Sequence, residues 1–153
     1  MPSLHKVVAD LAPRRQTLSA LDNKLSELVR TFEEKLREHV STRVSTCIDS
    51  GMREEIGSSW IEMLTFGKWD NKWQFLLETG DDDDPENWKI QPLGSAPREK
   101  RVQVFTEGHM EKLIREASKQ LDAQIAEREK AVKIADALIG VLDPLGADDD
   151  LPL

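Results

Sequence analysis

The acidic residues at positions 81–86 are the first candidates for chemistry. Asp81–Asp84 and Glu86 supply carboxylates, and carboxylate oxygens are the ligands that calcium prefers. The calcium loop of helix–loop–helix proteins, however, spaces its ligands, turns at a glycine in its sixth position and closes with a glutamate in its twelfth. This run has neither that glycine nor that spacing. We therefore interpret it as a solvated loop and predict no metal site.

Histidine and serine offer no catalytic arrangement. His5, His39 and His109 lie far apart, and no two of them have the i,i+4 spacing that presents two zinc ligands on one face of a helix. The serines at 58–59 lack the glycines that frame a nucleophile on a sharp turn. The sequence predicts no catalytic, cofactor-binding or metal-binding residue, and hence a protein that is not an enzyme.

Cys47 is the only cysteine, so no disulfide can form within the chain. A lone cysteine fits a reducing compartment. It falls among apolar residues at helical spacing, so we expect a small buried side chain rather than a nucleophile. The first residues lack a secretory apolar segment, and no run of about 18 apolar residues offers a membrane span. These features predict a cytoplasmic protein that does not enter a membrane.

All tryptophans lie between positions 60 and 88, in a chain without tyrosine: Trp60, Trp69, Trp73 and Trp88. They could form a stacking surface for a sugar, a base or a peptide, or the core of a small structural unit. We favour the core for Trp73 and Trp88. Trp69 falls in a predicted turn and should be the most exposed ring. Because tryptophan is a frequent anchor in protein interfaces, Trp69 is a candidate partner-binding residue.

The net charge of −8 is concentrated in two acidic runs, at positions 81–86 and 143–150. These runs hold nine of the 29 acidic residues, so the remainder carries 20 acidic against 21 basic residues. Duplex binding requires a basic surface that releases counterions, and the near-neutral body argues against it. Arg98, Lys100 and Arg101 open a predicted helix, where the helix dipole disfavours cations. Arg98 and Arg101 are therefore candidate contacts for an anionic partner, although we favour salt bridges to the nearby acidic loop.

A long helix is predicted from about residue 15. Its first part carries apolar residues at alternating spacings of three and four, as in a coiled-coil seam: Leu18, Leu21, Leu25, Leu28 and Phe32. Its second part steps strictly by four: Leu36, Val40, Val44, Ile48, Met52 and Ile56. Each step of four overshoots a helical turn by about 40°. The helix must therefore shift its partner surface, bend near residues 41–43 or stop near Gly51.

A small β insert is predicted at about 57–93, between two long helices. Strands are expected at 60–66 and 73–79, joined by a turn at 67–72, with a third at 88–91 before Pro92. Gly80 is expected in the following loop. A helix at 97–106 then leads through Gly108 into a second long amphipathic helix, with an apolar stripe from Leu113 to Leu142 that ends at Pro144 and Gly146.

We therefore predict an α+β fold, mostly α, in which two long antiparallel amphipathic helices flank a Trp-rich antiparallel insert of two to three strands. The predicted organisation is an N-terminal arm (1–13), a single helix–β–helix domain (14–146) and a disordered acidic tail (147–153). The apolar stripes exceed what one helical hairpin can cover. A homo-oligomer, with a dimer as the first expectation, would bury them in a four-helix arrangement.

The C-terminal residues Asp148, Asp149, Asp150, Leu151, Pro152 and Leu153 resemble the acidic tip of bacterial single-stranded-DNA-binding proteins. In that family a few aspartates precede an apolar–Pro–apolar end, which docks into basic, apolar pockets of repair and replication enzymes. The resemblance covers six residues, and the family usually ends in phenylalanine where this chain has Leu153. It implies partner-binding roles for Asp148, Asp149, Asp150, Leu151 and Leu153. The alternative is a solubilising tail.

These features predict a non-enzymatic protein–protein interaction protein, such as an adaptor, scaffold or assembly factor, that acts through helical self-association and exposed apolar surface. One alternative is a chaperone-like holder, which resembles the helix–hairpin–helix subunits of prefoldin in outline. Another is a DNA-metabolism accessory or phage-type inhibitor protein that docks through its acidic tip. No cofactor is expected, and the protein partner is not identified by the sequence.

Overall fold

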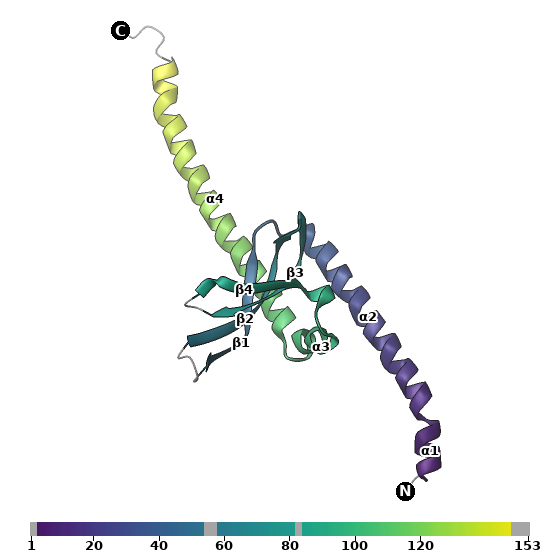
Figure 1. The fold of residues 1–153 in the computed structure, drawn as a ribbon. Coiled ribbons are helices and arrows are strands. Elements are labelled where there is room, and N and C mark those ends of the chain that lie inside the picture. The colour runs from purple at the N-terminus through teal and green to yellow at the C-terminus, as the bar shows by residue number, and fades with distance from the viewer. Residues whose placement is uncertain (1–2, 54–57, 82–83, 148–153) are drawn as a thin grey trace. The chain divides into compact units, whose positions relative to one another are not determined.

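The fold is α+β, as the sequence predicts. The computed structural model describes residues 3–53, 58–81 and 84–147, and it divides into two compact units, Met1–Glu116 (unit 1) and Ala117–Leu153 (unit 2). The elements in chain order are α1 (Leu4–Ala9), α2 (Leu11–Arg37), β1 (Val44–Arg53), β2 (Ser58–Trp69), β3 (Lys72–Asp81), β4 (Asp84–Pro92), the 3-10 helix η1 (Leu93–Ser95), α3 (Arg98–Thr106) and α4 (His109–Ala147) (Figure 1). The helix α4 begins in unit 1 and forms unit 2 from Ala117 onward.

The sheet of unit 1 is an antiparallel meander with strand order β1-β2-β3-β4 (Figure 1). The sheet has four strands where two to three were predicted, because β1 occupies residues that were expected to continue the first long helix. Val44, Thr46 and Ile48 alternate along this segment, and β-branched residues favour strands. A step of four is also two strand repeats, so Val44 and Ile48 satisfy a strand as well as a winding helical stripe. The last member of that stripe, Ile56, lies outside the described residues.

The helix α2 ends at Arg37, well before the predicted bend or stop. The backbone N–H groups of His39 and Val40 both donate to the carbonyl of Leu36, at 3.0 and 2.7 Å. These bonds satisfy a carbonyl that the ending helix would otherwise leave without a partner. Val40 is buried immediately afterwards, so the chain turns from α2 into the core of unit 1.

The hairpin between β2 and β3 is tighter than the predicted turn at 67–72. Only Asp70 and Asn71 lie outside the strands, with φ of 52° and 60°. Positive φ at both central residues defines the type I′ turn, which matches the twist of the flanking strands. Trp69 pairs with Lys72 across the hairpin and is therefore the last residue of β2 rather than a loop residue.

Gly108 separates α3 from α4, as its position in the sequence predicts. Its φ of 77° is a left-handed conformation that favours glycine at a helix end. The carbonyl of Gly108 accepts the backbone N–H of Lys112 in the first turn of α4. At its other end α4 extends to Ala147 and includes Pro144 and Gly146, so the predicted end is a few residues early.

The core of unit 1 centres on β2 and β3, where a cluster of apolar side chains is almost completely buried: Leu64, Phe66, Phe75 and Leu77. The ring of Phe66 lies 5.4 Å from that of Phe75 and 5.7 Å from that of Trp73, measured between centroids. Helices contribute Val29, Val104 and Leu113 to the same buried set. The expected core position of Trp73 is therefore only partly realised, because its ring contacts Phe66 while its side chain stays half-buried.

Glu33 joins α2 to the edge of β3. The backbone N–H of Phe75 donates to Glu33 Oε1 at 3.3 Å, one residue beyond the last pair between β3 and β4, Leu76 with Pro92. Burial raises the pKa of the Glu33 carboxyl above its ordinary value of 4.5, although this hydrogen bond and nearby cations, such as Lys72, partly oppose the rise. The carboxylate thus satisfies a backbone donor while its own charge is disfavoured.

We predict opposite consequences for two substitutions of Glu33. Glu33→Ala removes the acceptor of the Phe75 N–H and should lower the free energy of unfolding by about 1–3 kcal/mol.

Glu33→Gln keeps an acceptor and removes the buried charge. A raised folded pKa means that the folded protein holds the proton more tightly, so the parent chain loses stability as pH rises from 4.5 through the raised pKa. In urea unfolding between pH 4 and pH 8, Glu33→Gln should become more stable relative to the parent chain as the pH rises. A difference in unfolding free energy between the two proteins that does not change with pH would contradict this account.

Gly80 lies within β3 rather than in the predicted loop, and the indole of Trp88 on β4 covers it. A Cβ placed on Gly80 would lie 2.6 Å from ring atoms of Trp88. We expect Gly80→Ala to displace the indole and to destabilise unit 1 by about 1–3 kcal/mol. Gly94→Ala is the matched control, because its Cβ meets nothing within 4 Å. Equal effects of the two substitutions in thermal unfolding would contradict the close packing of Trp88.

Candidate interaction surfaces

The predicted seam on α2 is largely open to solvent. We define the α2 seam as Leu18, Leu21, Leu25, Leu28 and Phe32. Leu18 and Leu21 are each 61% exposed, whereas Leu25 and Phe32 are half-buried. The buried side chains of α2 are those of Val29 and Glu33, on the stripe beside the seam. The helix therefore packs one edge of its apolar surface into unit 1 and leaves the other edge uncovered.

The apolar seam of unit 2 is more exposed still. We define the α4 seam as Leu121, Ile125, Arg128, Val132, Ala135, Ile139 and Leu142, again at spacings of four and three. Every described side chain from Ile125 to Asp143 is exposed, including Val132 at 57%. The predicted antiparallel pairing of the two long helices would join α2 in unit 1 to the α4 seam in unit 2, and it stays a prediction.

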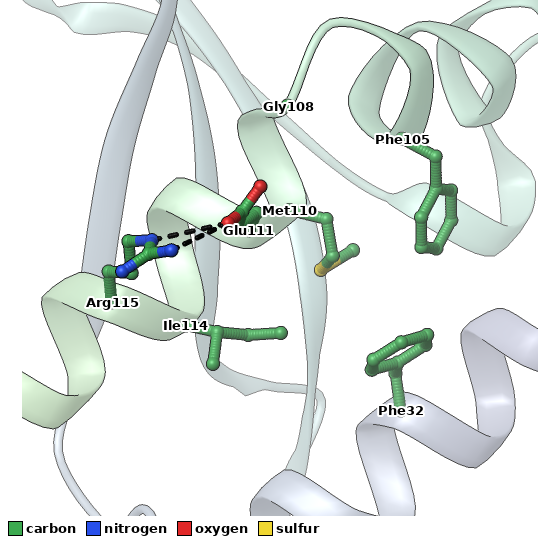
Figure 2. Close-up of a pocket in the computed structure, with 7 residues that line it drawn as sticks. All are labelled: Phe32, Phe105, Gly108, Met110, Glu111, Ile114 and Arg115. Carbon is green, nitrogen blue, oxygen red and sulfur yellow. Dashed lines mark hydrogen bonds and ion pairs between the residues drawn. The ribbon is translucent and has the colours of Figure 1, made fainter.

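A small apolar pocket lies in unit 1 where α2, α3 and the first turns of α4 meet. It has a volume of about 370 Å³ and is lined by Phe32, Phe105, Gly108, Met110, Glu111, Ile114 and Arg115. Figure 2 shows the ring of Phe32 from α2 and the ring of Phe105 from α3 on one side, with Met110 and Ile114 facing them. The two rings lie 5.6 Å apart between centroids. The pocket thus continues the apolar surface from the end of the α2 seam onto α3 and α4.

The polar groups of this pocket neutralise each other. Arg115 Nη2 donates to Glu111 Oε1 at 2.8 Å within one turn of α4 (Figure 2). Nearby, His109 Nε2 lies 3.1 Å from Glu107 Oε2, and hydrogen bonds from Gln103 and His109 lower the pKa of the Glu107 carboxyl. Among the residues that the structure describes, no group of three or more His, Cys, Asp or Glu side chains could hold a metal ion.

The basic residues at the start of α3 are divided between the surface and the core. Arg98 lies at the surface, 3.5 Å from Asp22 on α2, and Lys100 Nζ donates to Glu62 on β2 at 2.6 Å. Arg101 is only 8% exposed and donates to the carbonyls of Gly94 and Ala96. Arg98 and Lys100 thus pair with acidic residues of α2 and β2. The sequence favours salt bridges to the acidic loop instead. Arg98 remains on a surface, whereas Arg101 holds η1 against α3.

Arg98 and Asp22 also line a shallow apolar hollow of about 330 Å³, together with Leu18, Glu99 and Val102. Leu18 is the first residue of the α2 seam. Phe32, which lines the other pocket, is the last residue of the seam. Hollows therefore lie at both ends of the α2 seam. The sequence pattern signals the seam, but it contains no signal for the hollows, because these depend on how α3 packs against α2.

Trp69 and Cys47 are both accessible on the sheet. Trp69 is 40% exposed at the end of β2, while the other tryptophans are half-buried. Cys47 is exposed on β1, which contradicts its expected burial. The reason is the strand assignment, since a strand turns successive side chains to opposite faces and buries Thr46 instead. The predicted tail residues Asp148–Leu153, and Asp82 and Asp83 of the acidic loop, lie outside the described residues, so the docking role of the tail stays a prediction.

Comparisons of the chain with protein-family models, with curated proteins and with solved structures gave no match. In the described ranges of the structure, no helix is both long enough and apolar enough to cross a membrane.

Proposed function

We propose that this chain is a non-enzymatic protein–protein interaction protein, an adaptor, scaffold or assembly factor, that acts through self-association of its helices. The observation that carries the proposal is the uncovered α4 seam, on a helix whose described side chains from Ile125 to Asp143 are all exposed. Helices in proteins are stabilised mainly by packing an apolar face against a partner. A second copy of the chain provides such a partner, because a heptad seam is complementary to itself.

The α2 seam supports the same proposal from unit 1. Contiguous apolar surface on a monomeric protein marks an interaction site, and Leu18, Leu21 and Leu28 are all exposed on one face of α2. The hollows at the ends of this seam accept side chains of an opposing helix. We propose a dimer in which both seams become buried, with Arg98 at the edge of the interface beside Leu18 and Trp69 left outside it as a contact for a further protein.

The proposed location is the cytoplasm. The single thiol, Cys47, is exposed, and an exposed unpaired cysteine is best maintained in a reducing compartment.

Substitution on the α2 seam tests the proposal. Leu21→Glu places a charge at an exposed position, so the fold of the single chain should tolerate it. In the dimer the same charge would be buried against the opposing helix, which is costly. We expect the dissociation constant of the dimer to rise by roughly tenfold or more, about 1.4 kcal/mol or above, in sedimentation equilibrium at micromolar concentrations.

Asn23→Glu is the matched control, because Asn23 is also exposed on α2 but lies outside the seam. It adds the same charge and should leave the dissociation constant unchanged. Equal dissociation constants for the parent chain and Leu21→Glu would remove the α2 seam from the interface.

A further inference from the structure

We propose that the α4 seam pairs in parallel with the α4 seam of a second copy, so that the two helices run in the same direction and in register. This inference rests on the proposed function and deepens it, because it names the partner surface and its orientation. It concerns unit 2 alone, since the seam from Leu121 to Leu142 lies entirely within that unit.

The residue types of the seam favour a two-stranded parallel coil. In heptad notation the a positions hold Ile125, Val132 and Ile139, and the d positions hold Leu121, Arg128, Ala135 and Leu142. Branching at Cβ in position a combined with leucine in position d favours two strands in parallel coiled coils. The seam has this pattern at its three a positions and at its first and last d positions.

The charges beside the seam distinguish the two orientations. Each e position next to the seam is acidic: Asp122, Glu129, Asp136 and Asp143. In an antiparallel coil that overlaps the whole seam, e positions of one helix face e positions of the other. Asp122 would then lie near the second copy's Asp136, and Glu129 near the second copy's Glu129. The negative charges of these facing carboxylates repel one another, so the antiparallel orientation is disfavoured along the whole seam.

The parallel orientation avoids these contacts, because each e position then faces a g position of the other helix. The g positions are Gln124, Ala131 and Leu138, which carry no charge. Every acidic e residue therefore meets a neutral neighbour. The distribution of charge thus disfavours the antiparallel pairing and leaves the parallel pairing unopposed, which is how flanking residues commonly set the orientation of coiled coils.

Arg128 is the one charged residue of the seam, at a d position, and its side chain is exposed beside that of Glu127. A long arginine side chain can lay its methylene groups along an apolar seam while its guanidinium stays in water. In the parallel coil this guanidinium reaches the second copy's Glu129, at the adjacent e position. A charged residue at one layer also penalises shifted registers, in which it would face an apolar layer.

Single-cysteine cross-linking tests the orientation in the full chain. In a Cys47→Ser background, Ser118→Cys places a thiol one turn before Leu121 on the same face of α4. Two parallel, in-register helices bring this thiol next to the same thiol of the second chain. In the antiparallel coil it would lie opposite Leu142, and the two copies of the thiol would be about 36 Å apart along the axis. A short bifunctional maleimide can join only the first pair.

We expect Ser118→Cys to give on the order of tenfold more cross-linked dimer than Ala123→Cys, because pairing raises the effective concentration of adjacent thiols. Ala123 is exposed on the outer face of α4, so its cysteine measures random collision. Cross-linking that appears only when Ser118→Cys chains are mixed with Leu142→Cys chains would overturn the parallel orientation but leave self-association intact. A single-chain mass for the Cys47→Ser parent at all concentrations would overturn both proposals.

Discussion

Phe66→Ala should destabilise unit 1 by about 3–5 kcal/mol, which is the typical cost of truncating a buried aromatic ring. Phe66 is 1% exposed and its ring contacts those of Trp73 and Phe75. Folded domains have a total stability of only about 5–15 kcal/mol, so the variant should retain a small margin or unfold. Chemical unfolding followed by tryptophan fluorescence measures the loss, because Trp73 reports directly on this ring cluster.

Two further variants make this prediction specific. Phe66→Leu keeps most of the buried volume and should cost about 1.5 kcal/mol or less. Trp69→Ala truncates a ring that is 40% exposed on the same strand and should cost less than Phe66→Ala. A ranking in which Trp69→Ala is the more harmful substitution would contradict a core centred on the Phe66 ring cluster.

The double substitution Ile125→Glu/Val132→Glu should dissociate the proposed dimer. Both side chains are more than half exposed in the single chain, so the change removes little buried surface within the described structure. In the parallel coil, however, it places two carboxylates from each copy at consecutive a layers of the seam, on either side of the Arg128 layer, where burying a charge costs several kcal/mol. We expect the dissociation constant to rise by about a hundredfold or more, equivalent to about 3 kcal/mol.

The matched control is Ala123→Glu/Ala137→Glu. These two alanines are exposed on the outer face of the same helix, and alanine and glutamate have similar helix propensities. The control therefore adds the same charge without entering the seam, and its dissociation constant should stay within a few-fold of the parent value. Equal weakening by both pairs of substitutions would indicate general charge repulsion rather than a seam.

The sequence predicts the helices better than the start of the sheet. The seam from Leu18 to Phe32 has the mixed spacing of three and four that only a helix satisfies, and α2 forms there. The steps of four from Val40 to Met52 satisfy a helix and a strand equally. The alternation of Val44, Thr46 and Ile48 then decides for a strand, because β-branched side chains fit a pleated sheet better than a helix.

The placement of the candidate residues depends on tertiary packing that spacing does not encode. Arg98 and Arg101 belong to one basic run, yet the first is exposed and the second is buried with carbonyl acceptors. In the sequence, Glu33 is one of several charged residues on a predicted helix. In the structure, it accepts a hydrogen bond from the backbone N–H of Phe75. Both roles require another segment to pack beside the residue, η1 beside Arg101 and β3 beside Glu33. The local sequence does not show which segment packs there.

The mass of the unmodified full chain in solution tests the central claim most directly. Sedimentation equilibrium from high nanomolar to high micromolar concentration would follow it without any substitution or label. We predict a mass that rises from that of a single chain, 17.4 kDa, to twice that value. A mass of 17.4 kDa at every concentration would contradict self-association through the exposed seams.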